Sequence, residues 1–205
     1  MQERIMKKLA SVGLAQSAET VGALVEFLSL LSRWARVHNL TAVTEPEEMI
    51  DRHLVESLAL RSFLRGARIA DVGSGGGLPG IPLAIAEPER KFTLIESRGK
   101  RAQFLRHVSG VLGLTNVVVE HARVEDLLST PPFDTVLARA VAPLPELLKL
   151  VGHLFAPETI LLALTGESFS GEAATFAGGY RARRVDGPIA GLFRGSFIVV
   201  DKSED

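Results

Sequence analysis

The chain has no cysteine among its 205 residues. Disulfides, thiolate metal ligands and cysteine nucleophiles are therefore excluded, and the composition favours a reducing compartment. Long apolar runs are missing too: none reaches the roughly 20 residues that a membrane-spanning helix needs, and the N-terminus lacks the layout of a signal peptide. We expect a cytoplasmic protein that does not act at a membrane.

A strong excess of charge is the third absence. The formal net charge is −1, so a nucleic-acid partner would have to be met by a local basic patch. Of the 23 basic residues, 17 are arginine and 6 are lysine. Arginine suits bidentate contacts with phosphate and stacking on bases, so the composition permits RNA binding without requiring it. The length suits one domain with a short appendage.

A glycine-rich stretch follows a short apolar run in the middle of the chain. The run Arg68–Val72 is followed by the sequence GSGGGLPG at positions 73–80, with four glycines between 73 and 77. Glycine permits positive φ and a close approach of the backbone to a ligand, and a following helix N-terminus adds N–H donors. A plain turn would need fewer glycines. The pattern predicts a strand, a loop that binds a small polar or anionic molecule, and a helix.

The glycine spacing allows two ligands. Gly75, Gly77 and Gly80 fit the dinucleotide-binding pattern G-x-G-x-x-G. Gly73, Gly75 and Gly77 fit the G-x-G-x-G spacing of S-adenosylmethionine-dependent methyltransferases. The loop alone leaves both interpretations open.

The first 65 residues show helical periodicity. An apolar stripe recurs at helical spacing, and it consists of Leu24, Phe27, Leu28, Leu31 and Trp34. A second helix start is indicated where Thr44 can cap and Glu47 can close a capping box. An inward face follows, formed by Met49, Ile50, Leu54, Ser57 and Leu58. We expect residues 1–65 to be a helical extension that packs on a main domain of residues 66–205 and helps to position RNA.

From residue 68 onward, short β-rich runs alternate with helical runs. The expected strands are Arg68–Val72, Phe92–Glu96, Val117–Glu120, Thr135–Ala138, Ile160–Leu164, Arg181–Val185 and Ser196–Val200. The last two are too close for a crossover helix and should pair antiparallel. The fold class is therefore α/β, a doubly wound, mostly parallel seven-stranded sheet of the Rossmann-like type. The antiparallel finish favours a methyltransferase over a dehydrogenase.

Polar residues stand where these strands end. Glu96 lies roughly 20 residues past the glycines, where a carboxylate accepts ribose hydroxyls in either ligand class. Asp71 can orient the loop or a ligand amino group, or simply bond to loop amides. Backbone groups at Val124 and Glu125, after the third strand, can contact an adenine ring edge. Arg139, after the fourth strand, is either a ligand or RNA contact or the salt-bridge partner of a nearby acid.

The chain lacks the residues that two kinds of nucleic-acid methyltransferase require. An exocyclic-amine methyltransferase would carry Asn or Asp followed by Pro-Pro and an aromatic after the fourth strand, where this chain has Arg139-Ala140-Val141-Ala142. A C5-pyrimidine enzyme would need a cysteine. Guanine N7 carries an exposed lone pair and needs no proton removed, so catalysis there reduces to alignment and electrostatics. We therefore predict no general base and no metal.

Several motifs together are similar to one family. They are Asn39-Leu40-Thr41, Arg52-His53 with Glu56-Ser57-Leu58, the run 71–83 with its Gly-Leu-Pro-Gly-Ile-Pro segment, Gly99-Lys100-Arg101 with Phe104-Leu105, and Arg139-Ala140 with Leu144. In the same order along the chain, they resemble ribosomal RNA small subunit methyltransferase G, also called glucose-inhibited division protein B.

The resemblance implies N7 methylation of one guanine in the decoding-region loop of bacterial 16S ribosomal RNA, with S-adenosylmethionine as donor. On the matching positions it implies donor-binding roles for Gly73, Gly75, Leu78, Glu96, Val124, Glu125 and Arg139. The chain departs from the family after the fifth strand, where Thr165-Gly166 replaces the common Lys-Gly. We expect a monomer that acts on 16S rRNA or on the 30S subunit, including an assembly intermediate.

The remaining basic residues predict an RNA-binding face. Its members are Arg33, Arg36, Lys100, Arg101 and Arg123, although any one of them is more often a solvated surface charge. His53 likewise is more often a packing residue than a catalytic one. Two rival functions stay open, a methyltransferase for a small molecule or protein and a non-catalytic nucleotide-binding module.

Overall fold

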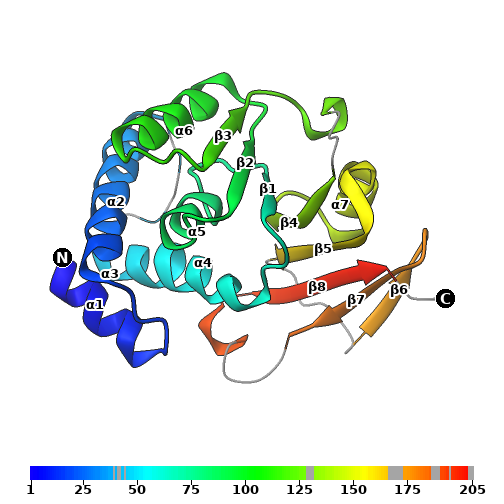
Figure 1. Cartoon of the computed structure of the whole chain (residues 1–205), viewed down its shortest axis with the longest axis horizontal. Coiled ribbons are helices and arrows are strands. Elements are labelled where there is room, and N and C mark those ends of the chain that lie inside the picture. Colours follow the sequence, from blue (N-terminus) through cyan, green and yellow to red (C-terminus); the bar gives the residue numbers. More distant parts are fainter. Residues whose placement is uncertain are drawn as a thin grey trace.

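The computed structural model describes residues 1–38, 40, 43, 45–127, 132–165, 173–185, 190–193 and 195–202. These residues form one eight-stranded sheet with the order β3-β2-β1-β4-β5-β8-β7-β6 (Figure 1). The strands are β1 Arg68–Val72, β2 Lys91–Ile95, β3 Val117–Glu120, β4 Phe133–Arg139, β5 Phe155–Thr165, β6 Ala173–Phe176, β7 Tyr180–Arg184 and β8 Ser196–Lys202. Strands β1 to β5 pair in parallel, and β8, β7 and β6 continue the sheet with antiparallel pairing.

The α/β class and the antiparallel pairing of β7 with β8 are confirmed, but the predicted number of seven strands was wrong by one. The additional strand is β6, which pairs only with β7 at the edge of the sheet. Its four residues are too few to show a clear alternation of apolar and polar side chains. The available signal was the pair Gly178-Gly179 between Phe176 and Tyr180, both at positive φ, which is typical of a hairpin turn.

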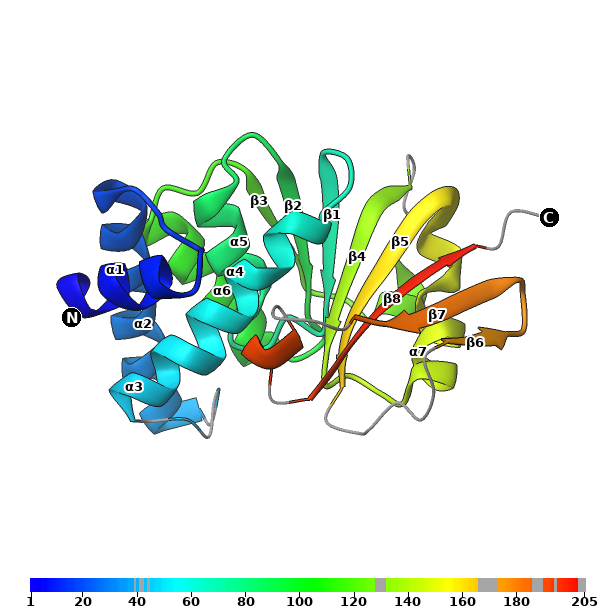
Figure 2. The same cartoon turned by 90° about the horizontal axis from the view of Figure 1, so that it is seen from below.

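The helices occupy the N-terminal third of the chain and the connections between parallel strands. They are α1 Gln2–Ser11, α2 Ala18–His38, α3 Pro46–Met49, α4 Glu56–Ala59, α5 Gly80–Ala86, α6 Gly99–Val111 and α7 Leu144–Val151. Short 3-10 turns are η2 Leu60–Phe63, η3 Val124–Asp126, η4 Gly152–Leu154 and η5 Ala190–Leu192, and η1 Ile50–Val55 is a π-helical turn. Figures 1 and 2 show the N-terminal helices at one end of the molecule and the β6–β7 hairpin at the other.

The two faces of the sheet build two hydrophobic clusters. Side chains that alternate along the strands point to opposite faces, so Ile69 joins the cluster under the N-terminal helices while Ala70 joins the cluster under α7. By the same alternation Asp71 and Arg139 face the side that the N-terminal helices cover. Charged groups at the strand ends therefore meet residues from the first third of the chain.

The predicted apolar stripe of α2 is confirmed, because Leu24, Phe27 and Leu31 are fully buried. Helix α2 packs on α5 and α6 within the same cluster that contains Ile69 and Phe92 of the sheet. The helical segment thus shares its core with the sheet. The division at residue 65 into an extension and a main domain stays a prediction. No helix in the described part of the chain is long and apolar enough to cross a membrane.

Residues 46–63 form one helical run whose hydrogen-bond spacing changes along its length. The capping residue that we predicted, Thr44, lies outside the described residues; Glu45 is the N-cap of α3 and makes no side-chain capping bond. The predicted inward face is confirmed, with Met49 and Leu54 among its buried members. The hydrogen bonds of a π-helical turn span one residue more than those of an α-helix, and such turns occur frequently at functional sites. It carries Arg52 and His53.

Candidate donor and substrate site

Most amides of the glycine loop donate hydrogen bonds within the loop or to the end of β2. The N–H groups of Gly73 and Ser74 donate to the carbonyl of Ile95 at 2.9 and 3.2 Å, and those of Gly77 and Leu78 donate to the carbonyl of Ser74 at 2.7 and 3.2 Å. Since these donors are used, the loop does not present the row of bare amides that we expected. No described residue donates to the carbonyls of Gly73, Gly75 or Gly76, and these carbonyls would suit a cationic ligand.

The backbone conformation separates the two glycine patterns. Gly73, Gly75 and Gly77 have φ of +67°, +55° and +81°, so all three glycines of the methyltransferase spacing are required by conformation. Gly80 differs, because a Cβ there would lie 2.5 Å from Leu94 Cδ2 and 2.6 Å from Asp71 Oδ2. Its role is close packing of α5 on the sheet.

The N-terminus of α5 offers no anion site of the dinucleotide-binding kind. The N–H of Gly80 donates to Asp71 Oδ2 at 3.1 Å, and the N–H of Ile81 donates to the carbonyl of Gly77 at 2.8 Å. Position 82 is a proline without an N–H. A pyrophosphate would need these donors free, so the geometry disfavours the dinucleotide interpretation.

Glu96 ties the loop after β1 to the loop after β2. It is 4% exposed, and its two oxygens accept the N–H of Gly75 at 2.9 Å and the N–H of Arg98 at 2.8 Å. A carboxylate offers about four acceptor positions, so the two amides do not exhaust them. The predicted location beside the glycines is confirmed, and its ribose-binding role stays a prediction.

Asp71 is the second buried acid beside the loop. Burial raises the pKa of its carboxyl to about 7, against hydrogen bonds from Ser74 and Gly80 that act to lower it. Its Oδ1 makes no hydrogen bond to a described residue. Of the alternatives we considered, the structure shows the bond to a backbone amide, through Gly80. We call Asp71, the loop 73–80 and Glu96 the glycine corner.

Arg139 joins the end of β4 to the N-terminal helices. Its Nη2 lies 3.0 Å from Glu56 Oε2, its Nη1 donates to the carbonyl of Arg52 at 2.9 Å, and its side chain is 18% exposed. Burial is the main cause that lowers the pKa of Arg139, and the charge of Glu56 opposes it. The salt-bridge alternative for Arg139 is thus present in the structure; ligand contact stays a prediction. We call Arg52, Glu56 and Arg139 the arginine corner.

His53 lies beside the arginine corner and is buried. Burial, and next the charge of Arg139, lower its pKa to about 4, so the imidazole is neutral at pH 7. The next residue after Arg139, Ala140, has φ of +51°, which is unusual for a residue with a side chain. Such backbone strain is concentrated at functional sites.

A cleft of about 300 Å³ lies between the two corners. Its lining includes four residues predicted to bind the donor, Gly73, Gly75, Leu78 and Arg139, and also Arg101, which was predicted to bind RNA. Leu40, Val43, Arg52 and His53 complete one wall. Sequence periodicity gave no reason to place these four at the cleft; only the resemblance, through its motifs containing Leu40, Arg52 and His53, marked the segment.

A second cavity of about 130 Å³ adjoins the cleft and shares Arg52, Arg139 and Ala140 with it. Its other lining residues are Glu56, Leu164, Thr165, Phe193 and Gly195. The ends of β4 and β5 form its floor, since Arg139 pairs with Leu164 across these two strands. Thr165, the departure from the family pattern, therefore lies in this second cavity.

Three predicted donor-binding residues are not among those that line the cleft: Glu96, which contacts the lining residue Gly75, and the two residues Val124 and Glu125 of the turn after β3. Val124 begins the turn η3 after β3 and is 8% exposed within the cluster that includes Val72 and Ile95. Glu125 is exposed in the same turn. The turn follows a strand parallel to β2 and so lies at the same edge of the sheet as Glu96. Contact with an adenine ring stays a prediction for Val124 and Glu125.

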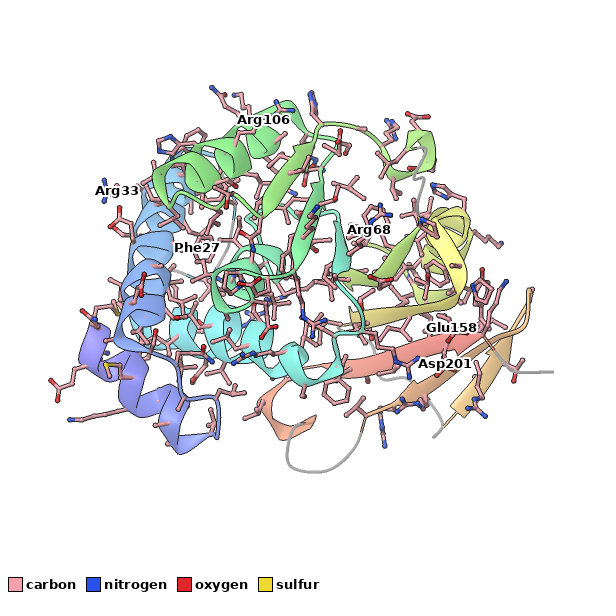
Figure 3. The ribbon with its side chains drawn as sticks, viewed as in Figure 1. Phe27, Arg33, Arg68, Arg106, Glu158 and Asp201 are labelled. Atoms are coloured by element: carbon pink, nitrogen blue, oxygen red, sulfur yellow. The ribbon has the colours of Figure 1, made fainter. Side chains whose placement is uncertain are left out.

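The predicted RNA-binding residues do not form one group. Lys100 is exposed in the first turn of α6, Arg101 beside it is half-buried in the cleft, and Arg123 is exposed after β3. Arg33 is exposed on α2, where its Nη2 donates to Ser29 Oγ at 2.9 Å (Figure 3). The side chain of Arg36 lies outside the described residues. RNA binding by all five stays a prediction.

The comparisons with known proteins agree on one family. A family model described as rRNA small subunit methyltransferase G (GidB) matches residues 20–184. Ribosomal RNA small subunit methyltransferase G of Nitrosospira multiformis is 47% identical over 148 residues, which cover 72% of this chain and 68% of that protein. The protein of the same name from Stenotrophomonas maltophilia is 43% identical over 177 residues, covering 86% of this chain and 82% of the relative.

A solved structure supports the fold alone. A methyltransferase from Geobacter sulfurreducens superimposes with a TM-score of 0.60 at 13% identity, covering 87% of this chain and 89% of that one.

Proposed function

Since the chain belongs to the rRNA small subunit methyltransferase G family, we propose that it transfers a methyl group from S-adenosylmethionine to N7 of a guanine in the decoding-region loop of 16S ribosomal RNA. The observation that carries the donor assignment is the glycine corner. Most of its amides are used internally, and Gly73, Gly75 and Gly77 take positive φ in the methyltransferase spacing.

The residues present fit a donor that carries both cationic groups and a carboxylate, because Arg52, Arg101 and Arg139 line the cleft together with the glycine loop. Gly73 and Gly75 line the cleft, no described residue donates to their carbonyls, and Glu96 accepts the N–H of Gly75. When bound, the donor supplies a methyl group on a sulfonium. The dinucleotide-binding module has no equivalent support, because the donors at the N-terminus of α5 are used.

Methyl transfer to guanine N7 requires little of the protein beyond the correct placement of the two reactants. Guanine N7 attacks with its own lone pair, so no residue has to remove a proton, and binding both reactants in line lowers the entropic part of the barrier. His53 is neutral at pH 7 and adds no charge near the sulfonium. Alignment by the two corners is therefore the contribution of this chain.

Our proposal also covers the form of the substrate, which we take to be a ribosomal particle and not naked rRNA. We propose that the monomer acts on the 30S subunit or on an assembly intermediate, with the basic residues of α2 and α6 contacting rRNA phosphates. The exposed side chains of Arg33 and Lys100 support this assignment, since phosphate contacts come mostly from exposed basic side chains. Thr165 in place of the family's lysine favours a substrate in which other contacts hold the RNA.

Methyl-label transfer tests the proposal. Purified protein with labelled S-adenosylmethionine is incubated with naked 16S rRNA, 30S subunits that lack the modification, and precursor particles, and the modified nucleotide is mapped. We expect one labelled guanine and faster labelling of a particle than of naked RNA. Donor binding without label in any RNA would contradict the function, and label on a small molecule or protein would establish the rival methyltransferase.

A further inference from the structure

The second cavity lies where an acceptor atom has to be. The cleft beside the glycine loop is proposed to hold the donor, and the cavity shares Arg52, Arg139 and Ala140 with it. Both open at the carboxyl-terminal edge of the parallel strands, where open α/β sheets bind their ligands. A base in this cavity would therefore face the donor across the residues that the two spaces share.

One carboxylate lines this cavity among the residues that the structure describes, and it is Glu56. The residue is 5% exposed and lies 3.0 Å from Arg139. Burying an ion pair costs desolvation energy that its attraction often does not exceed, so stability alone is a weak reason for this arrangement. The pair fixes the carboxylate against the cavity.

We propose that this cavity receives the target base and that Glu56 selects guanine there by accepting hydrogen bonds from its N1–H and N2 amino group. The inference rests on the proposed function, because it names the residue that recognises the base in that reaction.

Guanine fits this carboxylate better than the other RNA bases do. On its Watson–Crick edge guanine presents two adjacent donors, N1–H and the N2 amino group, which match two carboxylate oxygens. Adenine presents an acceptor at N1, and the pyrimidines present at least one acceptor beside their donor. A carboxylate has about four acceptor positions, more than the two that guanine needs, so a bond to Arg139 and bonds to the base are compatible. Extruded bases are recognised through this edge and by stacking.

The remaining wall suits a flat ring. Phe193 lines the cavity, is 9% exposed, and is held by Phe197 with ring centroids 4.9 Å apart. Leu164 adds a second apolar surface at the end of β5. In the views of Figures 1 and 2 the turn η5, which precedes Phe193, lies beside α4, which begins with Glu56.

The charge of Glu56 also suits the reaction. When the N7 lone pair forms the new bond to the methyl carbon and the carbon–sulfur bond breaks, its electron pair stays on sulfur and the positive charge passes to the guanine ring. The N1–H becomes more acidic as this charge develops. A carboxylate that accepts N1–H therefore binds the transition state more strongly than the neutral base, which raises the rate.

The test compares guanine with inosine, which lacks only the N2 amino group. Reconstituted 30S subunits carry guanosine or inosine at the mapped position, and kcat/KM of labelling is measured for each. We expect the wild type to prefer guanosine by about 10-fold or more, the range of one hydrogen bond to a charged group. In Glu56→Gln we expect labelling of guanosine to fall about 100-fold and the preference to shrink to about threefold.

Controls keep the result interpretable. Glu158→Gln makes the same chemical change at an exposed position near the start of β5, which Figure 3 labels, whereas Leu164 and Thr165 at the other end of this strand line the cavity; both rates should stay unchanged. Donor affinity by calorimetry should stay within about threefold of the wild type in Glu56→Gln. If that variant does not fold, the guanosine-to-inosine ratio of the wild type decides, and a ratio near one overturns the proposal.

Failure of the proposed function and failure of the role proposed for Glu56 would give different results. A wild type that labels neither substrate contradicts the proposed function itself. A wild type that labels both equally, or a folded Glu56→Gln variant with the wild-type ratio, overturns only the role of Glu56. A purely structural role would lower the melting temperature and both rates together and leave their ratio intact.

Discussion

The glycine corner and the arginine corner lie at the same edge of the sheet but are built in opposite ways. In the glycine corner Gly75 bonds to Glu96 over 21 positions of sequence, and Gly80 bonds to Asp71 over 9. In the arginine corner Arg139 bonds to the carbonyl of Arg52 over 87 positions. The first uses backbone amides on carboxylates, and the second uses a buried ion pair. A local corner forms wherever its segment folds, whereas a long-range corner exists only in the complete fold.

Packing at Gly80 should be the most sensitive feature of the local corner. Gly80→Ala places a Cβ within 2.6 Å of Asp71 Oδ2 and closer still to Leu94, so we expect a loss of about 3 kcal/mol in the free energy of unfolding. Gly110→Ala is the matched control, because nothing lies within 4 Å of its Cβ in α6, and it should gain about 0.5 kcal/mol. Urea denaturation measures both, and equal effects would contradict the packing role.

The pH dependence of stability distinguishes the corners by sign. The pKa of Asp71 rises from 3.8 to about 7, so the folded state keeps a proton that the unfolded chain loses; its contribution is complete below the unfolded value and is lost as pH rises toward 7. The pKa of His53 falls from 6.5 to about 4, so its contribution is complete above 6.5 and is lost as pH falls toward 4.

Between pH 4 and 6.5 the two slopes oppose each other, and each is at most about 1.4 kcal/mol per pH unit. We expect a nearly flat profile for the wild type, a profile rising with pH for Asp71→Asn, and a profile falling with pH for His53→Gln. Unfolding free energies measured by urea denaturation across this range provide the check. Parallel profiles in all three proteins would show that neither group is perturbed by its corner.

Backbone strain in the loop should affect the donor more than the fold. Gly75 has φ of +55°, and its Cβ would have no neighbour closer than 3.7 Å, so Gly75→Val acts by strain rather than by collision with the protein. We expect about 1–2 kcal/mol of strain and at least a 10-fold loss of affinity for S-adenosylmethionine in calorimetry. Gly75→Asn, which tolerates the left-handed conformation, should lose less. Equal affinities in the two variants would contradict this reason.

The smallest effects that we expect are those of Lys100 and Arg101, two neighbouring residues of α6, on RNA and donor binding. Lys100 is exposed and outside the cleft, so Lys100→Gln should reduce the salt dependence of RNA binding by about one unit of slope and leave donor affinity unchanged. Arg101 lines the cleft, with its Nη1 3.7 Å from the Cβ position of Gly75, and Arg101→Gln should change both affinities. Filter binding at several salt concentrations and calorimetry measure the two. If Arg101→Gln spared the donor, Arg101 would belong to the RNA face alone, as first expected.

The contrast between the corners also explains what the sequence could predict. Strand ends, glycine spacing and the position of Glu96 follow from short-range patterns, and the structure brings them together as expected. The edge strand β6 was missed because four residues carry little pattern. The cleft wall from Arg52 and His53 was missed because a π-helical turn has no periodicity signal and its partner Arg139 is remote in sequence.

The same limit applies to the roles of single residues. Arg139 could be placed at the sheet edge from its strand, but its acidic partner could not be chosen, since any acid facing the same side of the sheet was eligible. Val124 and Glu125 follow β3 as predicted, yet their distance from the cleft depends on how η3 packs against Val72 and Ile95. The position of a residue along a strand follows from nearby sequence, whereas the partner of its side chain depends on the complete fold.

The buried pair of Glu56 and Arg139 has a consequence for how such chains diverge. A substitution that removes either charge leaves the other uncompensated inside the protein, which typically costs about 3–5 kcal/mol. Selection would therefore remove a protein with a single change at either position before a compensating change could arise. Across homologous chains we expect positions 56 and 139 to covary as one inherited unit, although one belongs to the helical N-terminal segment and the other to the sheet.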